Sequence, residues 1–380
     1  FLAADERLLH DPFGLADMGA AVERLTRAIR VGERVGVYGD ADADGLTAAL
    51  VLTEALGGLG AHVVPYIPGR REGLTADGLA RLAEGGCRVV ITADVGVSAV
   101  AEAEFARAAG IDLIITDHHL PPESLPTALA VINPRRADQH YPFGDLAGVG
   151  VAYKLAQGLA LSLGRELAAE GLLELVAIGT VADVMPLTGE NRYLVRQGLR
   201  ALARTGRPGL KALAALGRID LGAATADTIA FQLAPRLNAA SRLGDGILSF
   251  RLLSTRDPAE AQALAEILER LNAERQTVLN EVAARVWPEV DAALAAGRNL
   301  VFIEVEGCPP GLLGLIASRI TDAVRRPAVV VTFDGDEGRG SGRSIPEFDL
   351  HAALTRLAGY LTAFGGHRLA AGFNFRRQNL

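Results

Sequence analysis

Cysteine is nearly absent from this sequence: only Cys87 and Cys308 occur among its 380 residues. Two isolated cysteines exclude a disulfide framework and a thiolate metal site, and they favour a reducing, cytoplasmic setting. Long apolar runs are also missing, because charge or glycine interrupts each of them well short of a membrane span, so we expect no membrane-spanning helix. We find no internal repeat, low-complexity tract or signal peptide. The chain opens with Phe-Leu instead of Met, so an upstream segment is expected.

An excess of positive charge is lacking too. The chain has 38 Lys and Arg against 45 Asp and Glu, a net charge of −7. This balance argues against a surface that coats nucleic acid through diffuse positive charge, but it allows a focused basic groove. Hydrophobic residues make up 49% and charged residues 22%, which are values of a soluble globular protein. A chain of this length is expected to form two or three domains.

The first 150 residues alternate short apolar runs with Ala- and Leu-rich stretches. Near-continuous apolar strands that alternate with helices predict a parallel sheet covered on both faces. Ligands of such sheets gather at the carboxyl ends of the strands. The expected strands are VGVY (35–38), HVVPYI (62–67), RVVITAD (88–94), DLIITD (112–117) and LAVIN (129–133), with helices at 46–60 and 98–110 between them.

The rest of the chain has a different pattern. Residues 151–245 are mainly helical, and 257–297 form one long amphipathic stretch that is expected to bridge two domains. The runs NLVFIEVEG and RPAVVVTFDG and the glycine-rich GRGSGRS then predict a smaller α/β domain, with GRGSGRS as a turn. The predicted fold class is therefore α/β, a parallel-sheet domain joined by a long helix to a smaller α/β domain.

Carboxylates and imidazoles follow three of the predicted strands. YGDADADG (38–45) gathers three aspartates in one turn, ITADVG adds Asp94, and TDHH follows the fourth strand. Asp183 stands in the apolar run AIGTVADVMPL, where an unpaired carboxylate would be costly. Each feature alone is typical of a turn, a cap or an ion pair. Together, at one sheet edge, they predict a site for two hard or borderline divalent cations such as Mn²⁺ or Mg²⁺, which would neutralise the like charges.

These motifs resemble the DHH phosphoesterase superfamily, and within it the RecJ single-strand-specific exonucleases, over nearly the whole chain. The resemblance rests on motifs that occur in the family's order: GDADADG (39–45), TADVG (92–96), TDHH (116–119), NP (133–134), AIGTVADVMPL (177–187), APRLNAASRLGD (234–245), GLLGLIASRI (311–320), GSGRS (340–344) and FGGHRLAAGF (364–373). It implies two-metal hydrolysis of phosphodiester bonds on a nucleic-acid strand. It also implies a DHH domain at 1–245, a connecting helix at 246–298 and a DHH-associated substrate-binding domain at 299–380.

The resemblance also implies roles for individual residues. His119 would contact the scissile phosphate or assist proton transfer, and Asp117 would orient the histidines. Asp40 would support the metal ligands without binding a metal itself. Asp94 would bridge the two metals. The metal ligands implied are Asp42, Asp44, Asp94, His118 and Asp183.

Further polar residues suit phosphate recognition. Guanidinium groups bind phosphate through paired hydrogen bonds, and glycine-rich segments allow close approach of a ligand. For the arginines, intradomain pairing with Asp183, Asp245 or Asp349 is the alternative. The candidate substrate-binding residues are Arg236, Asn238, Arg242, Ser341, Arg343 and His367.

The leading functional interpretation is a metal-dependent 5′–3′ exonuclease on single-stranded DNA that serves repair and recombination. Its expected partners are single-stranded DNA and either a single-strand-binding protein or a helicase. The family's OB-fold is not found before Leu380, so the chain is a trimmed core or a short relative. Two alternatives stay open: a DHH phosphodiesterase for oligoribonucleotides or cyclic dinucleotides, and a non-catalytic DHH scaffold. Tyr38 stands where related pyrophosphatases have a metal-binding histidine, which weakens a pyrophosphatase interpretation.

Overall fold

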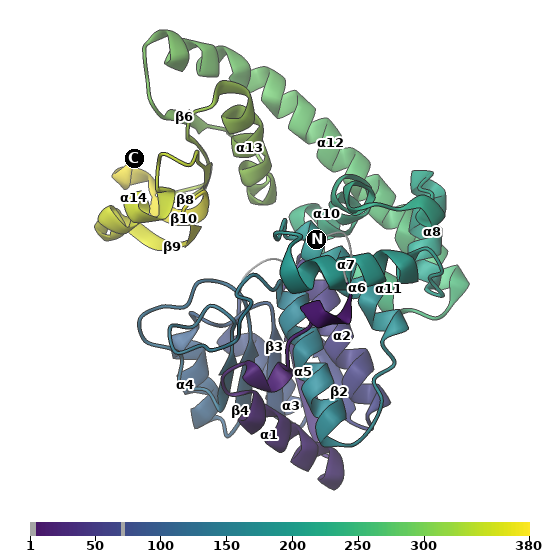
Figure 1. Ribbon diagram of the computed structural model, residues 1–380. Coiled ribbons are helices and arrows are strands. Elements are labelled where there is room, and N and C mark those ends of the chain that lie inside the picture. The colour runs from purple at the N-terminus through teal and green to yellow at the C-terminus, as the bar shows by residue number, and fades with distance from the viewer. Residues whose placement is uncertain (1–4, 70–72) are drawn as a thin grey trace. The chain divides into compact units, whose positions relative to one another are not determined.

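The computed structural model describes residues 5–69 and 73–380, and it divides the chain into two compact units (Figure 1). The first unit is Phe1–Arg270 and the second is Leu271–Leu380. The division falls within one long helix, α12 (Pro258–Ala295). This helix confirms the long helical stretch predicted from the sequence, although Pro288 lies inside it and does not end it.

The first unit contains the predicted parallel sheet. Its strand order is β2-β1-β3-β4-β5, and each neighbouring pair is parallel. Apolar β-branched residues fill these strands on both faces, as expected for a sheet that is buried on both sides. All five predicted strands are confirmed: β1 (Arg34–Gly39), β2 (His62–Tyr66), β3 (Cys87–Ala93), β4 (Asp112–Thr116) and β5 (Ala130–Ile132).

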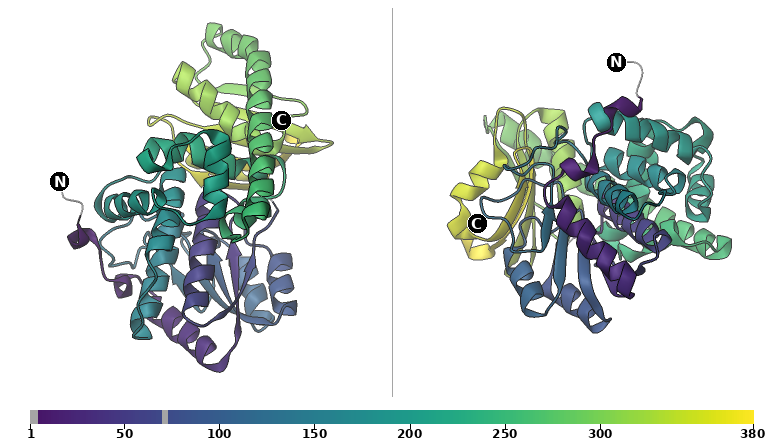
Figure 2. Two further views of the ribbon diagram at one scale, coloured as in Figure 1. Left: turned by 90° about the vertical axis from the view of Figure 1, so that its right-hand side faces the viewer. Right: turned by 60° about the horizontal axis from the view of Figure 1, so that its bottom comes forward.

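Helices cover both faces of this sheet, as the views in Figure 2 show. One face packs against α3 (Ala76–Glu84) and α4 (Val100–Ala108) in a core that includes Leu79, Val90 and Ala106. The other face packs against α2 (Ala43–Gly58), with α1 (Met18–Val31) and α5 (Gly148–Ser162) beside it. The carboxyl ends of β1, β3 and β4 therefore open onto one edge, where the polar motifs follow them.

Helices make up the remainder of the first unit. The pair α6 and α7 packs closely together, and α6 also lies against α2. No helix in the described ranges is both long and apolar enough to span a membrane. The elements are α6 (Glu170–Ala182), α7 (Gly189–Leu202), α8 (Pro208–Gly217), α9 (Ala226–Thr228), a π-helical turn (Ile229–Leu233), α10 (Ala234–Leu243) and α11 (Ile247–Ser254), with short 3₁₀ turns at Glu6–Leu8, Pro12–Gly14 and Leu221–Ala223.

The second unit holds a mixed sheet of order β6-β7-β8-β10-β9, in which only β6 and β7 run parallel. Its apolar core includes Val331, Leu350 and Phe375. The elements are β6 (Val301–Glu304), β7 (Ala328–Asp334), β8 (Glu337–Arg343), β9 (Leu361–His367), β10 (Ala370–Arg376), α13 (Leu313–Val324) and α14 (Leu350–Arg356), with 3₁₀ turns at Pro310–Leu312, Ala358–Tyr360 and Arg377–Asn379.

The prediction that GRGSGRS forms a turn is wrong. The segment is most of β8, which pairs with β7 on one side and β10 on the other, so its backbone N–H groups belong to the sheet. Its glycines make room for large side chains on the sheet. A Cβ at Gly340 would lie 2.2 Å from the ring of Phe373, and one at Gly338 would lie 2.7 Å from Phe375.

Candidate metal centre

The acidic turn after β1 is held by hydrogen bonds and by close packing. Asp42 caps α2, with its Oδ1 accepting from the N–H groups of Asp44 at 3.0 Å and Gly45 at 3.1 Å. Gly45 closes the motif because a Cβ there would lie 2.6 Å from Cβ of Asp40. Asn238 fixes the turn from α10, since its Oδ1 accepts from Ala43 N–H at 2.7 Å. The turn is thus built to hold its carboxylates in place.

Asp44 is buried at the amino end of α5. Its Oδ2 accepts from Gly148 N–H at 2.7 Å and its Oδ1 from Val149 N–H at 2.9 Å, where the helix dipole favours a negative charge. Burial nevertheless raises the pKa of Asp44 well above its usual range, and the nearby charges of Asp183 and Asp42 raise it further. Ionised Asp44 therefore needs additional positive charge nearby.

Asp94 follows β3 and is 3% exposed. Its backbone has a φ of 65°, a left-handed conformation that aspartate tolerates better than most residues, and its N–H donates to Thr116 at 2.9 Å. Burial raises the pKa of Asp94 well above its usual range, and the charges of Asp44 and Asp42 add to that shift. Gly148 leaves space for this side chain, because a Cβ there would lie 2.5 Å from Asp94 Oδ1.

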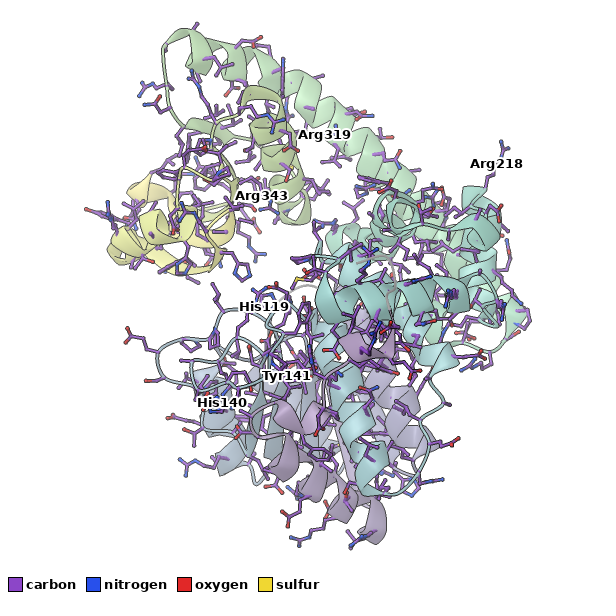
Figure 3. The ribbon with its side chains drawn as sticks, viewed as in Figure 1. His119, His140, Tyr141, Arg218, Arg319 and Arg343 are labelled. Atoms are coloured by element: carbon purple, nitrogen blue, oxygen red, sulfur yellow. The ribbon has the colours of Figure 1, made fainter. Side chains whose placement is uncertain are left out.

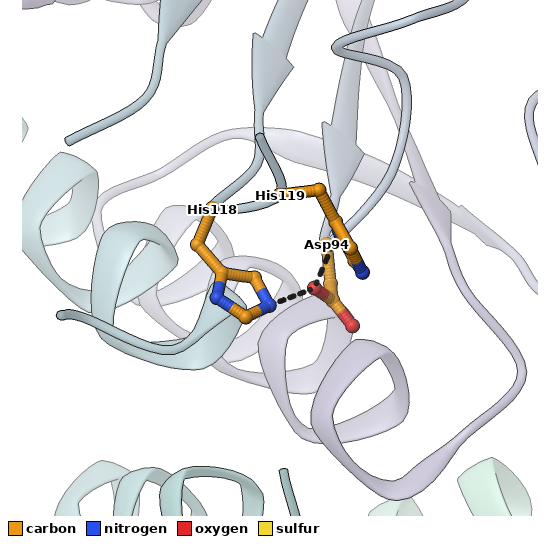
Figure 4. A group of neighbouring side chains, drawn as sticks. All are labelled: Asp94, His118 and His119. Atoms are coloured by element: carbon orange, nitrogen blue, oxygen red, sulfur yellow. Dashed lines mark ion pairs between the residues drawn. The ribbon is translucent and has the colours of Figure 1, made fainter. Parts of the chain in front are cut away.

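The TDHH segment places two imidazoles beside Asp94 (Figure 4). Asp117 accepts from the backbone N–H groups of His118 and His119 at 2.7 and 3.1 Å, and from Val97 N–H at 2.9 Å. It also lies 2.7 Å from His119 Nδ1, and this fixes the orientation of that ring. Burial alone would raise the pKa of Asp117, but the bond from His119, the charges of both histidines and the bond from Val97 N–H together outweigh it and lower the pKa to about 2.

The two histidines differ in their surroundings. Burial, with a smaller contribution from the charge of His119, lowers the pKa of His118 to about 3. Burial would also lower the pKa of His119, but its bond to Asp117 and the charges of the surrounding carboxylates together outweigh that and raise the pKa to about 9. In the absence of a cation, His118 is therefore neutral and suited to act as a ligand.

Three carboxylates surround the ring of His118. Its Nε2 lies 3.2 Å from Asp94 Oδ1, 3.3 Å from Asp183 Oδ2 and 3.8 Å from Asp44 Oδ2. Within the described residues, neither ring nitrogen of His118 nor Oδ1 of Asp94 has a hydrogen-bond partner, although all three atoms are buried. Orphaned polar atoms of this kind are costly unless something else satisfies them, and a cation bound among them would do so.

The donor atoms form three overlapping groups in which all atoms lie within 4.8 Å of one another. Carboxylate and imidazole donors without thiolate suit Mn²⁺ or Mg²⁺, so the residues present fit such ions. Among the carboxylates of these groups, Asp94 is the one that belongs to two, which suits a bridging position, and Asp40 shares a group with Asp42. The groups are Asp94, His118 and His119; Asp44, His118 and Asp183; and Asp40, Asp42 and Asp94.

The predicted substrate-binding residues of the first unit are less uniform. Arg236 forms an ion pair with Glu269 of α12, at 2.6 Å, instead of the predicted alternatives Asp183 and Asp245. Asn238 supports the acidic turn, as described above. Arg242 lies in the last turn of α10. A substrate role for these three residues stays a prediction. For Arg236, the ion pair with Glu269 counts against that role.

The predicted residues of the second unit lie on β8 and β9. Arg343 Nη1 lies 3.4 Å from Ser341 Oγ and 2.9 Å from the carbonyl oxygen of Gly342. Gly314 of α13 makes room for both side chains, because a Cβ there would lie 2.8 Å from Arg343 Nη2. His367 ends β9.

Sequence reasoning missed several residues that shape the metal centre. Gly148 and Val149 bind Asp44 through their N–H groups. Gly179 of α6 lies against the same carboxylate, because a Cβ there would lie 2.6 Å from Asp44 Oδ1. Asn133 donates to the backbone oxygen of His119 at 2.8 Å. For Gly148 and Val149, the available signal in the sequence was the pair of glycines that opens an apolar helix, in GVGVAYK (148–154).

Two family models match this chain. The DHH family N-terminal domain matches residues 34–180, and the DHHA1 domain matches residues 297–380. The single-stranded-DNA-specific exonuclease RecJ of Bacillus subtilis is 40% identical over all of this chain, which spans about half (48%) of that relative's length.

Solved structures give the same result. RecJ of Thermus thermophilus in complex with Mn²⁺ is 35% identical, with a TM-score of 0.84, and the match covers 95% of this chain and 52% of that one. An exonuclease RecJ bound to manganese is also 35% identical, with a TM-score of 0.82, and the match covers 97% of this chain and 91% of that one. With both family domains present and likeness over nearly the whole of a solved RecJ chain, this chain belongs to the RecJ family of DHH phosphoesterases.

Proposed function

We propose that the chain is the core of a 5′–3′ exonuclease that hydrolyses phosphodiester bonds in single-stranded DNA during repair and recombination. The observation that carries the proposal is the buried Asp94 carboxylate, which shares one donor group with Asp40 and Asp42 and another with His118 and His119. The relatives described above are single-stranded-DNA-specific exonucleases, which supports the choice of substrate.

The residues of the centre have separable roles in this proposal. Asp42, Asp44, Asp94, His118 and Asp183 would hold two Mn²⁺ or Mg²⁺ ions, with Asp40 beside them. Such ions, when bound, activate a water and stabilise the leaving oxygen of a phosphate ester.

The remaining two groups act on the substrate. Asp117 holds Nδ1 of His119. The opposite ring nitrogen, Nε2, would then contact a non-bridging oxygen of the scissile phosphate. His119 thereby positions that phosphate and supplies or accepts a proton at Nε2. Its side chain is 39% exposed, so a substrate can reach it.

Residues 299–380 form the proposed substrate-binding domain. Ser341, Arg343 and His367 would hold the terminal 5′ phosphate of the strand, so that it enters by its end. The pairing of Arg343 with Ser341 Oγ supports this, since it gathers several phosphate donors at one place.

We extend the proposal to the setting of the enzyme. Both cysteines are buried and unpaired, which suits a reducing cytoplasm. A single-strand-binding protein or a helicase is the expected partner. A helicase would expose the single-stranded substrate, and a single-strand-binding protein would protect it.

The test of this function uses single-stranded DNA labelled at either end. With Mn²⁺ or Mg²⁺, we expect a 5′ label to be released at once in a mononucleotide and a 3′ label to give a ladder of shortened strands. EDTA should stop the reaction and Ca²⁺ should not restore it, because its looser coordination positions the nucleophile poorly. Turnover in EDTA would contradict the metal mechanism, and cleavage of dinucleotides alone would favour the small-substrate alternative.

A second prediction concerns the terminal phosphate. Replacing Arg343 by alanine should weaken binding of 5′-phosphorylated strands, relative to 5′-hydroxyl strands, by ~1.5 to 3 kcal/mol, the range for a lost charged hydrogen bond. The measurement is the ratio of kcat/KM for the two kinds of strand. Arg368→Ala is the matched control, because Arg368 pairs with Asp349 at 3.9 Å and should leave the ratio unchanged. An unchanged ratio in the Arg343 variant would contradict the assignment.

A further inference from the structure

Val184 has an unusual backbone and an exposed side chain, and it directly follows a candidate metal ligand in the chain. It follows Asp183, whose Oδ2 lies 3.3 Å from His118 Nε2. Consecutive Cα atoms are about 3.8 Å apart, so this is the distance between the Cα atoms of Val184 and the candidate ligand Asp183. Its side chain is 86% exposed, the highest value among the exposed large apolar residues of the described ranges.

The backbone of Val184 is strained. Its φ is 57°, a conformation that β-branched side chains rarely adopt. Five described residues other than glycine have a positive φ, and Val184 is the β-branched one among them. The five are Asp17, Asp94, Val184, Arg218 and Arg325. Strain of this kind persists where the surrounding structure or the function requires it.

The local hydrogen bonds explain the conformation but not the valine. Val184 N–H donates to Val181 at 3.1 Å and Met185 N–H donates to Thr180 at 3.2 Å, which closes the end of α6 in a Schellman motif. Glycine would satisfy this motif without strain. The valine side chain also gains little from packing, because it is almost fully exposed. Neither backbone nor packing therefore accounts for an apolar side chain here.

We propose that Val184 binds substrate, with its methyl groups against the sugar and base of the nucleotide whose phosphate lies at the metal centre. The proposal rests on the proposed function and adds a contact that is independent of metal and phosphate. Apolar contact with a base or sugar is tolerant of sequence, as an exonuclease that removes successive nucleotides requires. The Val184 side chain is exposed in the free chain, and a bound nucleotide would cover it.

The test compares Val184→Gly and Val184→Asn with the parent chain, since both glycine and asparagine tolerate a positive φ. We expect KM for a 5′-phosphorylated oligodeoxynucleotide to rise about tenfold in both variants, the effect of losing a small apolar contact. The value of kcat should stay within about twofold, because the contact is equal in the ground and transition states. Mn²⁺ affinity, measured by calorimetry, should not change, which would show that Asp183 has not moved.

Arg218 provides a matched control. It ends α8 with a φ of 52° and the same two hydrogen bonds, from its own N–H to Ala215 and from Ile219 N–H to Ala214. Figure 3 shows its side chain pointing outward, away from His119. Arg218→Gly and Val184→Gly should both keep or raise the melting temperature, because glycine relieves the strain at each position. Only Val184→Gly should change KM.

The outcomes separate this inference from the proposed function. If the parent chain does not shorten single strands, the proposed function fails. If the parent is active and both Val184 variants keep its KM, the substrate contact is contradicted. A lower melting temperature with unchanged KM would contradict it as well, since Val184 would then serve stability alone.

Discussion

Replacing Asp94 by alanine is expected to lower hydrolysis of single-stranded DNA by at least about 10³-fold, the scale on which the loss of one charge-stabilising group acts. The carboxylate belongs to two donor groups at once, one with His118 and His119 and the other with Asp40 and Asp42. Its loss therefore removes a ligand from both. Saturating Mn²⁺ should not restore the rate, because the bridge itself is missing.

The fold should survive this change. Asp94 is buried among like charges that raise its pKa, so its removal lowers the repulsion among the remaining carboxylates in the absence of metal. Thermal melting without metal should give a midpoint close to that of the parent, because the lower repulsion offsets the cost of alanine at a φ of 65°, while calorimetric titration should show weaker Mn²⁺ binding. Activity within tenfold of the parent would contradict the bridging role.

Two further variants separate chemistry from backbone effects. Asp94→Asn keeps a residue that tolerates the φ of 65° and should be inactive as well, if the charge of the bridge is what matters. Asp17→Ala is the matched control, since Asp17 has a φ of 61° and binds Val131 N–H and Arg136 instead of the metal centre. It should cost stability and leave the catalytic rate unchanged.

The parallel sheet could be predicted from the sequence because its strands are nearly continuous apolar runs. The bounds of β1 and β4 differ from those predicted by only one or two residues. The segment GRGSGRS could not be predicted from local pattern, because glycine is unfavourable in strands. Contacts with Phe333, Phe373 and Phe375 decide its structure, and those rings come from other strands.

The gathering of the candidate metal ligands was predictable for a related reason. The carboxyl ends of parallel strands meet at one edge, so Asp44, Asp94 and His118 could be brought together without knowing the packing of the helices. The helices supply what strand order cannot. The N–H groups of α5 that bind Asp44, and Glu269 of α12 that binds Arg236, are far from their partners in sequence. Such pairings depend on tertiary structure. The glycines of GVGVAYK indicate that a close approach is possible there, but no local pattern identifies the partner.

A buried charge cluster ties the segment at His10 to α5 and α7. Lys154 of α5 and Glu190 of α7 form an ion pair, and they are only 1% and 0% exposed. Glu190 also accepts from the hydroxyl of Tyr141 and from His10 N–H at 3.2 Å. Lys154 donates to the backbone oxygen of His10 at 2.7 Å. Burial lowers the pKa of Lys154, against the opposing charge of Glu190.

Replacing Lys154 by methionine should therefore lower the free energy of unfolding of the first unit by about 3–5 kcal/mol, because it leaves Glu190 as an uncompensated buried charge. Chemical unfolding followed by circular dichroism gives the midpoint, and hydrogen exchange of α5 and α7 amides identifies the unit that opens. Adding Glu190→Gln should recover much of the loss, since the amide oxygen still accepts from Tyr141 and no charge is stranded. Lys211→Met, at an exposed position of α8, is the matched control and should change stability by less than about 0.5 kcal/mol. Equal effects of the two lysine variants would show that the buried pair does not hold the unit together.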